Sequence, residues 1–272
     1  MHKTKTLEDT PLKKSGRRFG FLFRFLKAVI KPFYPKYELM GLENIPDEPC
    51  IIVANHTQMY SPIVCELYLP DNFVTWCAGE MTKLKEVPAY AFKDFWSQKK
   101  PSVRWLFKIA SYLIAPLSVL VFNNARTIPV FRDNRIITTF KLSLSAVQDG
   151  KSLVIFPEHD EAHNNIVARF STKFTDIARM HFKNSGKRLS FVPTYVAPNL
   201  KKMYFGNPIV YDETNEKNKE RNRICDYLMD EITKIATSLP KHTVVPYRNI
   251  SKKYYPKNTD EKEVVQNGKN KV

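Results

Sequence analysis

The sequence predicts an α/β fold with a mixed, mostly parallel sheet flanked by helices. After residue 40, short runs of β-branched and aromatic residues alternate with stretches whose apolar residues recur at helical spacing. Strands that are separated by helices are typical of sheets covered by helices on their faces. A chain of 272 residues is long enough to bury one such domain together with appended segments.

Five runs have the composition of buried strands, and two later stretches have that of helices. The strands are expected at residues 51–54, 74–77, 127–130, 152–156 and 191–196. Apolar residues at 137, 140, 144 and 147 predict a helix that ends at Gly150, because glycine readily adopts the left-handed conformation found after helices. A second helix, marked by apolar residues from Ile224 to Leu239, is expected to stop before Pro240.

Residues 1–37 predict a basic, amphipathic, membrane-associating segment. They contain ten Lys or Arg against two acidic residues, so their net charge of +8 is half of the total of +16. Within FGFLFRFLKAVIK, three cations spaced by three and four residues form a narrow stripe on an otherwise apolar helix. Such a helix suits a membrane interface with anionic headgroups, although a basic helix packed on the domain is the alternative.

A second apolar stretch lies within residues 97–122 and is expected to be a membrane-associating insertion. Its core, WLFKIASYLIAPLSVLVF, is almost long enough to cross a bilayer. Because Lys108 and Pro116 interrupt it, we expect an immersed or re-entrant pair of short helices, or a buried hairpin. Together with residues 1–37, it predicts a peripheral or monotopic protein on the cytoplasmic face of the cell membrane.

The remaining segments complete the predicted organisation. Residues 38–250 form the α/β domain, and residues 251–272 are expected to be a polar, disordered tail. The four cysteines include no CxxC pair, which argues against a zinc site or a disulfide scaffold and favours a reducing compartment. The cations accompany apolar helices, and no recognised nucleic-acid motif is present, so nucleic acid is not the expected partner.

Polar clusters follow three of the predicted strands. They are Asn55-His56 after the first, Arg132-Asp133 after the third, and the run 158–161, EHDE, after the fourth. In open α/β sheets, ligand sites gather beyond the carboxyl ends of the strands. We therefore expect these clusters to share one cleft.

Four segments, in order ANHTQMYSP, RTIPVFRDNR, VIFPEHDEAHN and FVPTYVA, resemble the four signature blocks of the glycerolipid acyltransferase family, typified by 1-acylglycerol-3-phosphate acyltransferase. The resemblance covers about positions 38 to 200. It implies an O-acyltransferase of phospholipid biosynthesis that moves a fatty acyl group from acyl-CoA or an acyl-carrier protein to a lysophospholipid or related alcohol. No cofactor is implied.

The resemblance also implies roles for individual residues. His56 holds the position of the general base that takes a proton from the acceptor hydroxyl, with Asn55 and Ser61 shaping its loop. Arg132, with Arg126 as a second candidate, would bind an acidic headgroup. Glu158 would orient the site, and His159 and Asp160 are assigned to its substrate-binding border.

Three positions depart from the family pattern. Ser61 stands where the family has the aspartate that orients the histidine, His159 replaces a glycine, and Phe131 replaces a common aspartate. One hypothesis is that Glu158, Asp160 or Glu161 supplies the missing carboxylate to the His56 ring. The alternative is a catalytically impaired, acyltransferase-like protein that binds membranes.

Two further interpretations of single residues remain open. His159 and His163, four residues apart among acidic neighbours, would share one side of a helix and could then hold a divalent metal, but the pattern lacks the HExxH order and we expect no metal site. Ser61 before Pro62 is better explained as an ordinary turn hydroxyl than as a nucleophile, because no Gly-x-Ser-x-Gly elbow surrounds it.

Overall fold

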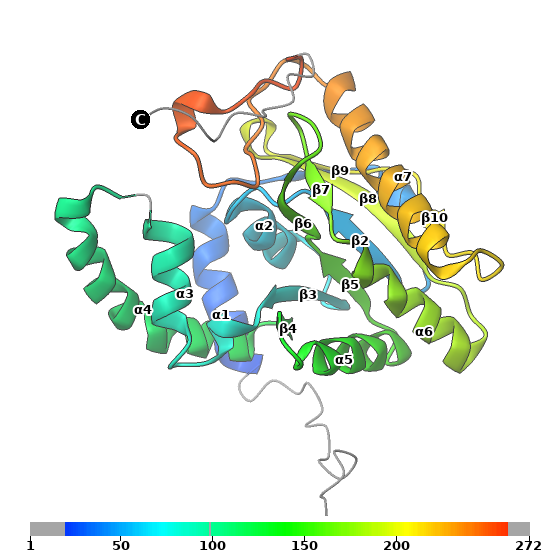
Figure 1. Ribbon diagram of the computed structural model, residues 1–272, viewed down its shortest axis with the longest axis horizontal. Helices are drawn as coiled ribbons and strands as arrows, with labels where there is room; N and C mark the ends of the chain where they lie inside the picture. Colours follow the sequence, from blue (N-terminus) through cyan, green and yellow to red (C-terminus); the bar gives the residue numbers. More distant parts are fainter. Residues whose placement is uncertain (1–19, 98, 261–272) are drawn as a thin grey trace, which may run out of the picture.

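The computed structural model describes residues 20–97 and 99–260 (Figure 1). The predicted basic segment is therefore seen only from residue 20 onward, and the predicted tail only as far as residue 260. The side chains of residues 20–23 and 26 also lie outside the description.

The described residues form an eight-stranded sheet in the order β1-β9-β8-β2-β5-β3-β4, with β10 paired to β8. The strands are β1 (Glu38–Met40), β2 (Cys50–Ala54), β3 (Phe73–Ala78), β4 (Thr127–Val130), β5 (Ser152–Ile155), β8 (Ser190–Ala197), β9 (Lys202–Phe205) and β10 (Ile209–Val210). The neighbours from β8 to β4 are all parallel, whereas β9 and β10 run antiparallel to β8. The predicted mixed, mostly parallel α/β fold is confirmed.

Seven helices accompany the sheet in the described part of the chain. They are α1 (Gly20–Ile30), α2 (Tyr60–Tyr68), α3 (Val87–Ala91), α4 (Arg104–Asn124), α5 (Ile136–Gln148), α6 (Asp176–Ser185) and α7 (Lys217–Ser238). All five predicted strands and both predicted helices are present, and Gly150, with φ of +77°, follows α5 as expected. A hairpin of β6 (Glu158–Ala162) and β7 (Ala168–Phe170), which the sequence did not predict, stands beyond the end of β5.

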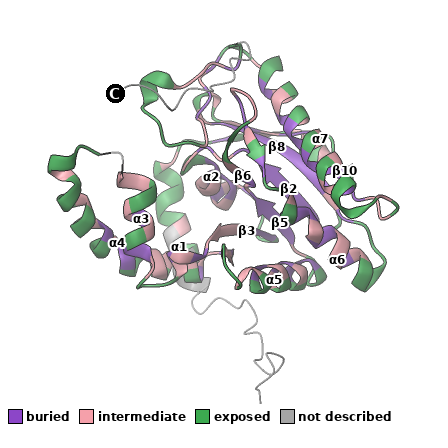
Figure 2. Cartoon of the chain, in the orientation of Figure 1, coloured by how far each residue is buried: buried purple, intermediate pink, exposed green. Residues whose placement is uncertain are grey.

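Alternate side chains of the central strands point to opposite faces of the sheet and pack in two separate hydrophobic cores. On one face, Ile51 and Val53 of β2 belong to a cluster that includes Ile224 and Leu228 of α7. On the other face, Ile52 packs in a cluster with residues of α2. The middle of the sheet is therefore buried on both sides, as Figure 2 shows for β2, β5 and β8.

Helix α4 corrects one expectation. The apolar stretch forms one continuous 21-residue helix that includes Pro116, not a pair of short helices or a buried hairpin. Proline removes a single N–H and is tolerated within apolar helices, so it did not end this one. The helix packs on α3, and both stand beside α1 at one end of the molecule (Figure 1).

The C-terminal residues correct another expectation. Residues 251–260 are packed against the domain, although the sequence predicted a disordered tail from 251 onward. Asn258 is buried, accepts a hydrogen bond from the N–H of His242 at 2.8 Å and donates to the carbonyl of Ala236 at 2.8 Å. Its amide satisfies main-chain groups beyond the end of α7, which composition alone could not reveal.

Candidate active site at the end of β2

Strand register brings the predicted polar clusters to one edge of the sheet. Val53 of β2 pairs with Ile155 of β5, so His56 and Glu158 each lie three residues beyond the same pair. On the other side of β5, β3 and β4 end at the paired residues Ala78 and Val130. The loop that carries Arg132 therefore begins at the same edge.

Asn55 fixes the direction of the chain as it leaves β2. Its side-chain amide donates to the carbonyl of Val196 at 3.2 Å, and its side-chain oxygen accepts from the N–H of Val196 at 2.7 Å. Both bonds continue the pairing between β2 and β8 by one residue. Val196 thus satisfies both the donor and the acceptor of this buried amide. Because this fixes Asn55, it also positions the His56 loop that follows.

The His56 ring lies between two aromatic rings. Phe156 packs edge-on against it with a centroid distance of 5.3 Å, and Tyr247 does so from a different element at 5.7 Å. Nδ1 of the imidazole is buried and has no hydrogen-bond partner among the described residues. Burial lowers the pKa of His56 to about 4, while the charge of Asp94 and the ring's own backbone carbonyl oppose this shift.

Glu158 contacts the main chain of His56 and not its ring. One carboxyl oxygen accepts from the N–H of His56 at 2.9 Å, and the other accepts from the N–H of Ala168 at 3.2 Å. Burial raises the pKa of Glu158 to about 8, although both N–H donors favour the charged carboxylate and act against the shift. Glu158 thus joins the His56 loop to the β6–β7 hairpin.

The proposed replacement of the missing carboxylate is not found. Within the described chain, no hydrogen bond joins the His56 ring to Glu158, Asp160 or Glu161. Both oxygens of Glu158 are used by backbone donors, and the Glu161 carboxylate pairs with Arg169 at 3.2 Å. Asp94, which follows α3 in sequence, is the acidic residue whose charge acts on the ring.

Ser61 is buried and turned toward Thr57. The two hydroxyl oxygens are 2.6 Å apart, and the N–H of Ser61 donates to the Thr57 hydroxyl at 2.9 Å. This pairing fixes the first turn of α2. A serine hydroxyl so engaged holds the turn at the start of α2, and within the described chain it makes no hydrogen bond to the imidazole.

The two predicted arginines lie at opposite edges of the sheet. Arg132 follows β4, and its charge acts on Tyr90 and Tyr247, which places it near the His56 site. Arg126 precedes β4, is buried, and pairs with Glu66 at 3.3 Å and Asp71 at 3.0 Å. The structure therefore does not bring Arg126 to the site, because Arg126 lies at the amino end of β4 and Arg132 lies beyond its carboxyl end.

His159 and Asp160 lie on β6 at the border of the site. Nδ1 of His159 accepts from the N–H of Glu161 at 3.3 Å, and the carbonyl of Asp160 accepts from the Arg248 guanidinium. Because residues 158–162 form a strand rather than a helix, His159 and His163 do not have the close spacing that a shared metal ion requires; four strand residues span about 13 Å. Among the described residues, no group of three His, Cys, Asp or Glu is arranged to hold a metal.

Tyr247 and Asp94 are the site residues that sequence reasoning missed. Tyr247 lies 191 positions after His56 in a segment without a motif, and Asp94 lies in the aromatic run FKDFW, which resembles ordinary packing. Burial and the Asp94 carboxylate both raise the pKa of Tyr90, whereas Arg132 opposes this. Tyr90, Asp94, Arg132 and Tyr247 thus share the electrostatic environment of the site.

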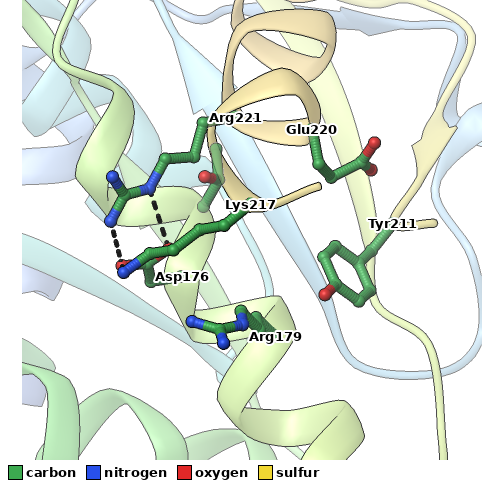
Figure 3. Close-up of a pocket in the computed structure, with 7 residues that line it drawn as sticks. Asp176, Arg179, Tyr211, Lys217, Glu220 and Arg221 are labelled. Carbon is green, nitrogen blue, oxygen red and sulfur yellow. Dashed lines mark hydrogen bonds and ion pairs between the residues drawn. The ribbon is translucent and has the colours of Figure 1, made fainter. Parts of the chain in front are cut away.

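Two shallow hollows lie away from His56. One is a shallow groove of about 330 Å³ on α4, lined by Trp105, Lys108, Ile109 and Tyr112. The other, of about 10 Å³, lies between α6 and α7, where Asp176 binds both Lys217 and Arg221 (Figure 3). Because these charges are paired with each other, this second hollow is a structural ion-pair cluster.

Replacing Glu158 with Gln is expected to destabilise the protein and change its pH dependence. Near pH 4.5, before the linked loss described next sets in, the single oxygen of the glutamine cannot accept from both N–H donors, and its NH₂ group faces one of them, so about 1–3 kcal/mol should be lost. In the native protein, Glu158 holds its proton up to a pKa of about 8, above its unfolded value of 4.5. Its contribution to stability should therefore fall as pH rises from about 4.5 to 8, by at most about 1.4 kcal/mol per pH unit.

Urea unfolding between pH 4.5 and 8.5 measures both effects. Glu161→Gln, at an exposed position on the same hairpin, is the matched control. A variant whose stability tracks that of the wild type across this range would contradict the buried, two-donor role of Glu158.

Comparison with known proteins gives a likeness in structure but none in sequence. No family model matches the chain, and no curated protein matches it by sequence. Among solved structures, the chain is similar to the 1-acyl-sn-glycerophosphate acyltransferase PlsC from Thermotoga maritima, with 15% identity and a TM-score of 0.45 over 79% of this chain and 78% of that chain. At this identity and TM-score, the likeness assigns no activity to any residue of this chain.

Proposed function

We propose that the protein is an O-acyltransferase that moves a fatty acyl group from an acyl thioester to a hydroxyl of a lysophospholipid or related acceptor. The observation that carries the proposal is His56 itself. A half-buried, neutral imidazole stands at the carboxyl end of a central parallel strand, beside the loops of Arg132 and Glu158. The order and spacing of the four sequence blocks support the same activity.

The reaction requires a base because a hydroxyl is a weak nucleophile. His56 takes the hydroxyl proton as the acceptor oxygen attacks the thioester carbonyl carbon. The new C–O bond forms, the C–S bond breaks, and the proton passes from the imidazole to the leaving thiolate. With a pKa of about 4, the imidazole is neutral and ready to accept a proton at physiological pH.

Arg132 is the cation for an acidic headgroup. Its side chain is exposed, and its charge reaches Tyr90 and Tyr247 at the site. A guanidinium binds a phosphate in a bidentate way. Glu158 supports the His56 loop, and His159 and Asp160 border the acceptor from β6; acyl-CoA or an acyl-carrier protein is the donor.

A second candidate is a catalytically impaired acyltransferase-like protein that binds membranes. The observation that favours it is the unpartnered Nδ1 of His56, since among the described residues no carboxylate is hydrogen-bonded to the ring. Without such a partner, the imidazolium formed during catalysis lacks direct charge stabilisation. Measured turnover distinguishes the two candidates.

We also propose that the protein lies on the cytoplasmic face of the cell membrane as a peripheral or monotopic protein. With residues 101–103, α4 is apolar enough to cross a membrane by length and composition, with a mean hydropathy of 1.8, and little of it is buried. Figure 2 shows most of its surface as exposed. Exposed cations at positions 99 and 100, just before the helix, and at positions 104 and 108, in its first two turns, are placed to meet anionic headgroups.

His56→Ala is expected to reduce acyl transfer by about 10²- to 10⁴-fold, because it removes the base. The measurement is transfer from labelled acyl thioester to a panel of lysolipids and other alcohols by purified protein. His181→Gln, on α6 away from the candidate site, is the control for loss of a buried histidine and should retain activity. Unchanged turnover by folded His56→Ala protein would remove His56 from the mechanism.

The pH profile is expected to show the lowered basicity of His56. Only the neutral ring accepts a proton, so kcat/KM should stay level down to about pH 5 and then fall, tenfold per unit below its pKa of about 4. Circular dichroism at each pH shows whether the protein is still folded, which distinguishes protonation of His56 from unfolding as the cause of the fall in kcat/KM. A limb centred near 6.5, the ordinary value for histidine, would show that the ring is not desolvated as described.

Membrane binding is expected to depend on the exposed face of α4. Leu113 and Leu117, with exposed fractions of 75% and 59%, would bury apolar surface in the bilayer. Changing both to Asp should weaken flotation with anionic vesicles at least about tenfold, since one buried leucine contributes about 1.5–3 kcal/mol. Ile137→Asp, at an exposed site on α5, should bind like the wild type; equal loss in both variants would contradict a role for α4.

A further inference from the structure

The chain that follows α7 crosses the edge of the sheet where His56 lies. We call residues 241–260 the C-terminal strap. Its first residues are anchored in the core, where Nε2 of His242 lies 2.8 Å from the buried hydroxyl of Tyr195 on β8. Its far end is anchored by the buried side chain of Asn258, which donates to the carbonyls of Ala236 and Leu239.

Between these anchors, three hydrogen bonds join the strap to three different segments of the candidate site. Gln58, two residues after His56, donates to the Tyr255 hydroxyl at 2.9 Å. The other two bonds run from strap side chains to main-chain carbonyls, from Arg248 to Asp160 on β6 and from Asn249 to Asp94 at 3.2 Å. The strap therefore contacts the segments after β2, β5 and α3 together.

The Gln58 contact occurs at a strained backbone position. Gln58 has a φ of +53°, in the left-handed region that residues other than glycine seldom adopt. Such a conformation costs of order 1 kcal/mol and persists where the surroundings hold it. The bond to Tyr255 is one such restraint, so the strap and the His56 loop fix each other.

Tyr247 is the strap residue that meets the imidazole. Its ring stands at 87° to the His56 ring, and Phe156, from the end of β5, stands at 74°. Tyr247 is half-buried and belongs to none of the three hydrophobic clusters of the described chain. Its ring contact is with His56, outside these three clusters.

We infer that Tyr247 is a positioning residue for acyl transfer, which holds the His56 imidazole in its reactive orientation and shields it from bulk water. This inference rests on the proposed function for its catalytic part. Edge-to-face packing against two rings restricts rotation of the imidazole, which has no hydrogen bond at Nδ1 to orient it. Tyr247 and Phe156 thus take over the orienting task of a carboxylate, without its charge.

The test compares Tyr247→Ala and Tyr247→Phe with the wild type. Carbethoxylation of His56 by diethyl pyrocarbonate, followed by mass spectrometry of the His56 peptide between pH 5 and 8, reports exposure and protonation of the ring without any acyl substrate. Tyr254→Ala, at an exposed strap position outside the described contacts of His56, is the matched control. Acyl transfer is measured on the same proteins.

In the wild type, His56 should react at a pH-independent rate over this range, because its pKa is about 4. Tyr247→Ala should raise the rate at pH 8 several-fold and make it fall toward low pH with a midpoint near 6.5, the value of a solvated imidazole. It should lower kcat more than it changes KM. Tyr247→Phe keeps the ring contact and should match the wild type in all of these measurements.

Unchanged His56 reactivity in folded Tyr247→Ala protein would overturn the inference. If Tyr247→Ala does not fold, Asn258→Ala, which releases the far anchor of the strap, takes its place and should also expose the ring; unchanged His56 reactivity there would equally overturn the inference. If the wild type transfers no acyl group to any acceptor, the proposed function fails, while carbethoxylation still decides whether Tyr247 covers His56.

Discussion

The hydrogen bond from the N–H of His56 to the carboxyl of Glu158 is the constraint on which the site depends. Two parallel neighbours, β2 and β5, end in register, so the residues that follow them meet at one edge. The buried carboxyl then needs donors, and the N–H groups of His56 and Ala168 are the ones it finds. Leaving such a buried group without partners costs about 1–3 kcal/mol, which is enough to select this path of the loop.

The electrostatic character of the site follows from the same burial. Glu158, with a pKa of about 8, and His56, with a pKa of about 4, are both shifted toward their uncharged forms near neutral pH. Burial is the largest cause in both cases, and it acts in opposite directions because one group is an acid and the other a base. The formal charges near the site belong instead to exposed residues such as Asp94, Arg132 and Asp160.

The central strands could be predicted because buried parallel strands consist of continuous β-branched runs, and residues 127–130 were predicted with the bounds that β4 has. The sequence could not reveal which of the two arginines reaches the site, because a separation of six positions does not show where each side chain lies. Only the structure reveals that the two arginines flank β4, whose four residues span roughly 13 Å, so that they lie beyond opposite ends of this strand.

Two larger errors have a common cause. Pro116 suggested a break in α4, and the polar composition suggested disorder at residues 251–260, yet both of these described segments take their conformation from their surroundings. The exposed helix α4 loses only one N–H at its proline. Asn258 binds four main-chain groups around the end of α7, a tertiary arrangement that no local pattern encodes. Tyr247 was missed for the same reason.

The structure explains the serine at position 61, where the acyltransferase pattern has an aspartate. It lies in the first turn of α2, fully buried, with its hydroxyl and N–H both bound to Thr57. A carboxylate at this fully buried position would be desolvated, and burial of that kind is costly unless the charge is paired. Serine satisfies the turn without that cost, and the loop keeps its shape. The imidazole is then oriented by aromatic packing from Phe156 and Tyr247, which requires no buried charge. The Ser61–Thr57 turn and the two rings beside the imidazole are therefore two parts of one arrangement, in which contact geometry orients the ring without a buried charge.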